Sequence, residues 1–93
     1  MPSEIVFRLP QGSQELSIGD TLGLRGRLTE RNLAEQNLKT TMSNAIRLAE
    51  RGGKAVIEPS PDQRGALRNA IGLEKADRGL SAELARLEQL LQS

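Results

Sequence analysis

The apolar residues of this chain change their spacing along the sequence, and this change limits the folds that the chain can adopt. Within residues 4–9 (EIVFRL) they alternate, which places Ile5, Phe7 and Leu9 on one side of a β-strand. From residue 28 onward they recur every three or four positions, which is the period of an amphipathic helix. A strand region followed by helical regions predicts an α+β fold with a small sheet packed against helices.

A second strand is predicted at residues 14–18 (QELSI), because Leu16 and Ile18 alternate with polar residues. The intervening residues 10–13 (PQGS) have the composition of a turn, since proline presets φ and glycine tolerates positive φ. A four-residue loop pairs Phe7 with Leu16, so that the apolar sides of both strands share one face, whereas a slip by one residue exposes one side. We therefore expect a hairpin whose four-residue loop is built on a type I turn.

The next segment, residues 19–27 (GDTLGLRGR), contains three glycines and is predicted to be a glycine-rich connector. A long helix is predicted from Leu28 over about 22 residues, or roughly 33 Å at 1.5 Å per residue. Thr29 is its expected N-cap, and the glycine pair at residues 52–53 supplies the C′ glycine that ends it. As the longest element, this helix is expected to span the domain.

Residues 54–58 (KAVIE) form a short β-branched run that Pro59 ends, and they predict a third strand. A strong helix start follows at residues 60–63 (SPDQ), with Ser60 as N-cap and Gln63 completing a capping box. The predicted order of elements is therefore β-β-α-β-α-α, with the third strand joining the N-terminal hairpin in a small sheet.

The C-terminal segment, residues 73–92, is predicted to be an amphipathic helix, and Gly79 leaves open whether it forms one helix or two. Its leucines recur at spacings of four and three, and several lie seven apart, as in a coiled-coil seam. They either pack on the chain's own sheet and helices or meet a second copy or another protein. In a shared arrangement, the first two leucines pack inside and the last three meet a partner. The candidate interface residues are Leu80, Leu84, Leu87, Leu90 and Leu91.

A cluster of arginines lies in residues 23–32 (GLRGRLTERN), just before or within the first turn of the predicted long helix. Cations at that end oppose the helix dipole, unless an anion such as a phosphate binds beside them. The segment is therefore either a solvated connector or a contact for phosphate or nucleic acid. Phe7 is the only aromatic residue, which argues against stacking of single-stranded bases. The candidate contacts are Arg25, Arg27 and Arg31, with Arg64 and Arg68 as further residues of a nucleic-acid surface.

The composition argues against catalysis. The sequence has no cysteine, histidine, tryptophan or tyrosine. Without cysteine it has no thiolate ligand. Without histidine it lacks the residue that is both the commonest general base and the commonest transition-metal ligand. Its carboxylates form ordinary helical pairs with basic residues, such as Glu74 with Arg78. We therefore expect a protein that is not an enzyme and that has no catalytic residue, cofactor or metal.

Charge and hydropathy narrow the range of partners. With 13 basic and 12 acidic residues the formal net charge is +1, so no global field steers the chain to DNA or to anionic lipid. No apolar run reaches transmembrane length, and the N-terminus lacks the pattern of a signal peptide. We expect one cytoplasmic domain, residues 1–93, with no membrane partner.

These observations favour a non-catalytic protein-interaction module that acts through an apolar helical surface. A small bacterial or phage accessory, adaptor or inhibitor-type protein fits this description, with itself as a homodimer or another protein as the partner. The alternative is a small dimeric nucleic-acid-binding regulator that uses the arginine cluster at residues 25–31.

Overall fold

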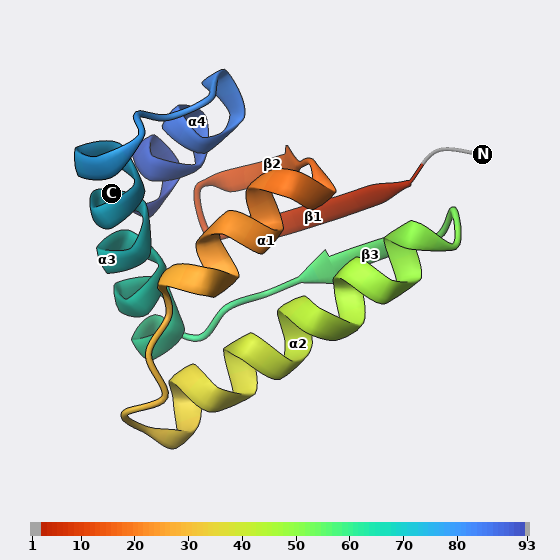
Figure 1. The fold of residues 1–93 in the computed structure, drawn as a ribbon, viewed down its shortest axis with the longest axis horizontal. Helices are drawn as coiled ribbons and strands as arrows, with labels where there is room; N and C mark the ends of the chain where they lie inside the picture. Colours follow the sequence, from red (N-terminus) through yellow and green to blue (C-terminus); the bar gives the residue numbers. More distant parts are fainter. Residues whose placement is uncertain (1–2, 93) are drawn as a thin grey trace.

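The computed structural model describes residues 3–92, and within them the chain forms a three-stranded sheet and four helices (Figure 1). The predicted α+β class with a small sheet is confirmed. The strand order is β2-β1-β3, with β1 antiparallel to β2 and parallel to β3. One helix more is present than the predicted order contains, because two helices separate β2 from β3. The elements are β1 (Glu4–Leu9), β2 (Gly12–Leu16), α1 (Ile18–Arg27), α2 (Leu33–Glu50), β3 (Lys54–Ile57), α3 (Pro61–Asp77) and α4 (Ala82–Leu91).

The hairpin of β1 and β2 has the predicted buried face but a different register. Leu16 lies opposite Ile5 and β2 begins at Gly12, so only residues 10–11 connect the two strands. The predicted four-residue loop, which pairs Phe7 with Leu16, is therefore wrong by two residues. A shift of two residues preserves the side on which each side chain lies, and for this reason Leu16 is still buried on the core face.

The glycine-rich connector predicted at residues 19–27 is wrong, because these residues belong to α1. The Ser17 side chain accepts a hydrogen bond from the Asp20 backbone N–H at 3.0 Å, which is an N-cap. This cap starts a helix at Ile18 and removes that residue from the predicted second strand. Leu24, which lies further along the same helix, is completely buried in the core. Tertiary packing thus overrides the low helix propensity of the glycines.

One glycine of α1 has a specific packing role. A Cβ at Gly23 would lie in van der Waals contact with α3, 3.4 Å from Oε2 of Glu74, so this position of α1 faces the Glu74 side chain. A Cβ at Gly26, in contrast, would meet nothing within 4 Å.

The long helix α2 begins five residues later than predicted. Leu28 caps the C-terminal end of α1 and is buried, and α2 starts at Leu33 with Asn32 as its N-cap. The predicted N-cap, Thr29, lies instead in the α1–α2 loop, where its backbone N–H and hydroxyl both donate to the Glu35 carboxylate at 3.1 and 3.0 Å. With 18 residues, α2 is still the longest helix among the described residues.

The remaining local predictions for the middle of the chain are confirmed. Gly52 ends α2 with φ of 83°, the left-handed conformation that favours glycine. The third strand follows as β3, and Ser60 and Gln63 form the predicted capping box at the start of α3.

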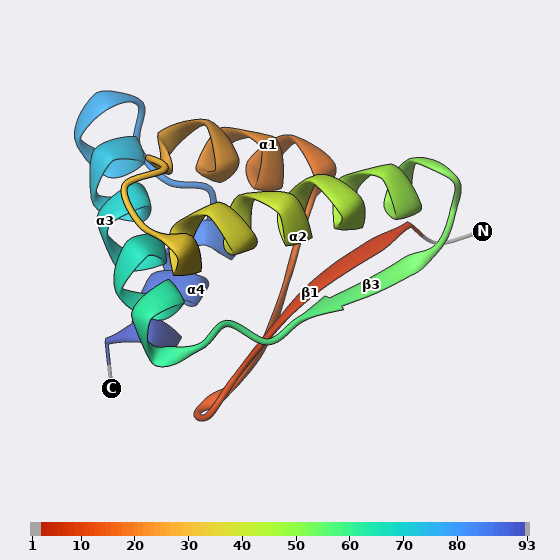
Figure 2. The same ribbon diagram turned by 90° about the horizontal axis from the view of Figure 1, so that it is seen from below.

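The core lies between one face of the sheet and the helices. Figure 2 shows α1 and α2 on one side of the strands. Alternate residues of the strands are buried on that face, whereas Arg8, Glu15 and Val56 are exposed on the other. The buried core residues of the sheet are Ile5, Phe7, Leu9, Leu16, Ala55 and Ile57.

The C-terminal segment, predicted to be amphipathic over residues 73–92 as one helix or two, forms parts of two helices. Its first residues, up to Asp77, continue α3, and Gly79 with φ of 84° turns the chain. Ser81 then caps α4 by accepting the Leu84 backbone N–H at 3.1 Å. This is the division that Gly79 left open.

Candidate functional site

The leucine stripe predicted as an interface packs within the chain itself. The exposed fractions of Leu84, Leu87 and Leu91 are 3%, 0% and 2%, and all three belong to the hydrophobic core. Leu80 and Leu90 are partly buried and pack against that core. The prediction of a contact with a partner is therefore wrong for Leu87 and Leu91 in this fold, because the β1–β2 hairpin and α3 supply the apolar surface that covers α4.

The three clustered arginines share no partner, and Arg25 donates to the Ser43 hydroxyl. Arg27 Nε donates to Glu74 Oε1 at 2.7 Å, and its Nη2 donates to Asp77 Oδ2 at 2.5 Å. Arg31 lies 3.4 Å from the carboxylate of Glu35. Residues two apart on a helix do not face one another, so Arg25 and Arg27 of α1 cannot form one surface.

The two further arginines of the predicted nucleic-acid surface also have partners inside the chain. Arg64 donates to the backbone carbonyl of Pro59 at 3.1 Å, and Arg68 donates to that of Leu91 at 2.8 Å. The structure therefore does not assemble the five predicted arginines into one basic face.

The contact between Arg27 and Asp77 shifts the ionisation of both groups. The hydrogen bond with Asp77, and then that with Glu74, raises the pKa of the Arg27 guanidinium. The hydrogen bond from Arg27, followed by the attraction of its charge, lowers the pKa of the Asp77 carboxyl. Both shifts favour the charged pair that joins α1 to α3.

A groove between α2 and β3, called here the edge groove, was not predicted. It has a volume of about 340 Å³, and its exposed apolar side chains are Leu48 of α2 and Val56 of β3, which are 45% and 39% exposed. Figure 1 shows α2 alongside β3 on the side away from β1. The groove is lined by Thr41, Asn44, Ala45, Leu48, Lys54, Ala55, Val56 and Ile57.

One border of the edge groove is a free strand edge. Since β3 is the last strand in the order β2-β1-β3, no described strand pairs with its outer side. The Gly53 carbonyl points toward β1, because it accepts a hydrogen bond from Glu4 N–H at 3.1 Å. The backbone groups of successive residues in a strand point in alternate directions. The backbone N–H and C=O groups of Lys54 and Val56 therefore point away from β1, as in an edge open to pairing.

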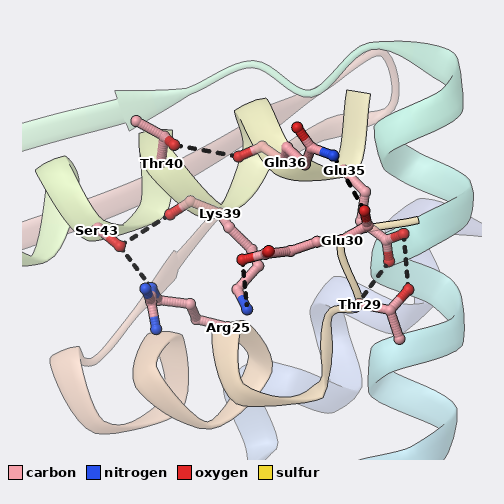
Figure 3. A network of polar contacts seen from close by, with 8 residues as sticks. All are labelled: Arg25, Thr29, Glu30, Glu35, Gln36, Lys39, Thr40 and Ser43. Carbon is pink, nitrogen blue, oxygen red and sulfur yellow. Dashed lines mark hydrogen bonds and ion pairs between the residues drawn. The ribbon is translucent and has the colours of Figure 1, made fainter. Parts of the chain in front are cut away.

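A second groove, called here the basic groove, lies between α1 and α2 and has a volume of about 390 Å³. Figure 3 shows its polar contacts: Arg25 Nε donates to Ser43 Oγ at 2.5 Å, and the Ser43 hydroxyl donates to the Lys39 carbonyl at 3.0 Å. Lys39 Nζ lies 3.5 Å from Glu30 Oε1. The groove is lined by Arg25, Glu30, Gln36, Lys39, Thr40, Ser43 and Arg47.

A smaller apolar hollow adjoins the basic groove and shares Arg25, Ser43 and Arg47 with it. Its volume is about 230 Å³, and Leu22 of α1 and Ile46 of α2 complete its wall. Arg47 also contacts its neighbour one helical turn earlier on α2, because its Nη2 donates to Asn44 Oδ1 at 2.5 Å.

The buried polar groups of the described chain are engaged in structural contacts. The Glu35 carboxylate holds the α1–α2 loop through Thr29, as Figure 3 shows, and every buried side-chain nitrogen or oxygen among residues 3–92 has a hydrogen-bond partner. In the same residues, no group of three or more acidic side chains is placed to hold a metal ion. No helix in this range has the length and hydropathy that crossing a membrane requires.

Comparison with known protein families, with curated proteins and with solved structures finds no match to this chain. The two grooves and their chemistry are therefore the basis for assigning a function.

Proposed function

We propose that this protein is a non-catalytic interaction module that binds an extended segment of a partner protein in the edge groove. The observation that carries the proposal is the free edge of β3 beside two half-exposed apolar side chains, Leu48 and Val56. An extended segment that pairs with such an edge adds a fourth strand to the sheet, which is a common mode of peptide recognition.

Backbone hydrogen bonds supply the first part of the binding. The outward groups of Lys54 and Val56 pair with the backbone of the added strand, and this pairing is independent of sequence. The side chains of the added strand alternate between the two faces of the sheet. On the helix-covered face they meet the wall formed by α2, where Leu48 offers the exposed apolar contact.

The groove also favours a particular chemistry in its partner. Complete burial of a leucine or valine contributes about 1.5–3 kcal/mol, so covering the half-exposed Leu48 and Val56 contributes about half of that each. Lys54 has an exposed side chain and only a long contact of 3.9 Å with Glu4. We therefore expect a segment with apolar residues at alternate positions and an acidic residue beside Lys54.

A foreign segment fits this edge better than a second copy of the chain. The residues of β3 and Glu58 are self-complementary, because antiparallel pairing about Val56 places Lys54 opposite the Glu58 position. A second copy, however, brings its own α2 close to the α2 that already packs beside β3 on one side of the sheet (Figure 2), whereas a lone segment needs the space of one strand. Self-association is therefore an outcome that the experiment must distinguish.

The experiment uses a display library of random peptides of about twelve residues, selected against the purified chain. Selected peptides are synthesised and titrated into ¹⁵N-labelled protein. We expect them to share alternating apolar residues and to shift the amide resonances of β3 and of the part of α2 that lines the groove. Leu48→Glu should weaken their binding at least tenfold. Leu73→Glu is the matched control, because Leu73 is 44% exposed on α3 and lies outside the groove.

Two results would overturn the proposal. The first is peptide binding that shifts resonances elsewhere or that Leu48→Glu and Leu73→Glu weaken equally. The second is a concentration-dependent dimer in sedimentation that Val56→Lys dissolves, because this result would assign the edge to a second copy of the chain.

A further inference from the structure

We propose that the basic groove between α1 and α2 binds the phosphate group of a small organic phosphate, with Arg25, Lys39 and Arg47 as its charged contacts. This site is separate from the edge groove, so the inference does not depend on the proposed protein-binding function. It also differs from the arginine cluster predicted from the sequence, of which it retains only Arg25.

The cations converge because of their spacing on two helices. Lys39, Ser43 and Arg47 lie four residues apart, which places them along one face of α2. That face lies beside α1, from which Arg25 reaches Ser43. Three basic side chains of a chain with net charge +1 thus border one groove.

Opposing negative charge in the groove is limited to one side chain. Glu30 is the one carboxylate among the lining residues, and its side chain is 66% exposed beside Lys39. Within residues 3–92, Arg25 and Arg47 form no ion pair, and their side chains donate to the neutral side chains of Ser43 and Asn44. The formal charge of the lining is therefore +2, from three cations and one anion.

The hydrogen bonds orient Arg25 for an anion. The Ser43 hydroxyl accepts from Arg25 Nε and donates to the Lys39 carbonyl, so both of its roles are used. The two terminal nitrogens of the Arg25 guanidinium remain available beyond this contact. A guanidinium presents such nitrogens in a fixed fork that matches two oxygens of a phosphate.

The adjoining hollow indicates what the phosphate is attached to. Leu22 is 49% exposed and lines this hollow together with Ile46. An apolar or planar carbon group can cover the exposed Leu22 side chain while its phosphate lies between Arg25 and Arg47. A phosphate monoester with such a group, for example a nucleoside monophosphate, combines both contacts.

The experiment titrates adenosine monophosphate into the ¹⁵N-labelled chain, with inorganic phosphate and adenosine as separate arms. We expect adenosine monophosphate to shift the amide resonances around Leu22, Arg25, Ser43 and Arg47 and to bind more tightly than inorganic phosphate. Adenosine alone should bind at least tenfold more weakly, because it lacks the charge that the three cations contact. Binding of adenosine monophosphate should also weaken as salt is added.

Variants assign the effect to the groove. Arg25→Gln and Arg47→Gln should each weaken the binding of adenosine monophosphate about tenfold or more, which is the loss of one charge-assisted contact. Ser43→Ala should weaken it less, because Ser43 only orients Arg25. Arg51→Gln is the control: Arg51 is exposed at the end of α2, outside the groove, and its loss removes the same charge.

The proposal is overturned if Arg51→Gln weakens binding as much as Arg47→Gln, since this would show a non-specific charge effect. It is equally overturned if adenosine monophosphate causes no shifts at millimolar concentration. A duplex oligonucleotide that binds more tightly than adenosine monophosphate and shifts residues around Arg64 and Arg68 as well would replace the small phosphate by a nucleic acid.

Discussion

Arg27 and Glu74 join α1 to α3 through a hydrogen bond of 2.7 Å, one helical turn from Gly23, which also faces the Glu74 side chain. The Glu74 side chain is 11% exposed, so its charge depends on this contact for compensation. The contact fixes α1, the helix that borders the basic groove, against the rest of the core.

Loss of the Arg27 side chain is expected to destabilise the chain. Arg27→Gln leaves the mostly buried Glu74 carboxylate without its cationic partner, and an unpaired buried charge is costly. We expect a clear fall in the midpoint of thermal unfolding. Arg78→Gln is the control, because Arg78 is an exposed residue at the C-terminal end of α3. Equal effects of the two variants, measured by circular dichroism, would contradict a specific role for the Arg27–Glu74 contact.

The Arg27–Asp77 pair predicts a loss of stability in acid. The pKa of Asp77 is lowered from its ordinary value of 3.8 in the folded chain, so its stabilising effect is complete above that value. The effect is lost as the pH falls through the lower pKa of the folded state. The stability difference between the wild type and Asp77→Asn should therefore be largest near neutral pH and vanish in strong acid. A difference that does not change between pH 6 and pH 2, measured by urea unfolding, would contradict this assignment.

Two glycines of α1 test whether this segment is a stable helix. Gly26→Ala should increase the free energy of unfolding by about 0.5–1 kcal/mol, because alanine favours the helix and its Cβ meets nothing within 4 Å. Gly23→Ala should give a smaller gain, because the added Cβ lies 3.4 Å from the Glu74 carboxylate that Arg27 holds. Urea unfolding of both variants provides the comparison. Equal gains at the two positions would contradict the contact between residue 23 and Glu74.

The buried leucines of α4 should behave as core residues. Leu87→Ala is expected to lower the free energy of unfolding by about 2–5 kcal/mol, the usual cost of a cavity in place of a buried leucine. Leu73→Ala, at a half-exposed position of α3, should change it by about 0.5 kcal/mol or less. If Leu87 instead lay at an intermolecular interface, its replacement would reduce self-association and leave the stability of the monomer nearly unchanged.

The local sequence patterns predicted most of the helices and strands, but not which other elements pack against their faces. Alternation identified the buried side of both hairpin strands, since registers that differ by two residues bury the same side chains. It did not give the loop length, which depends on whether Ser17 and Ile18 extend the strand or begin a helix. The glycines of residues 19–27 were misleading for a related reason: they lie in a packed helix, and Gly23 faces Glu74 of α3, a residue about fifty positions away in the sequence.

The candidate site was harder to predict than the fold. A leucine spacing of seven has the same appearance whether the stripe packs on a partner or on the chain's own hairpin, and only the tertiary structure distinguishes the two. The arginines near residue 27 are close in sequence but diverge around a helix. Lys39, Ser43 and Arg47 do show the spacing of one helical face, so the basic groove left a signal in the sequence. The edge groove left none, because it depends on the strand order.

The position of α4 links the two most distant parts of the described fold. Leu84, Leu87 and Leu91 cover the β1–β2 hairpin, so any state in which α4 has detached exposes the apolar face of that hairpin. Apolar surface that is exposed in a partly folded state promotes aggregation. Conditions that loosen α4 while the sheet and the other helices persist are therefore the conditions under which this protein should aggregate.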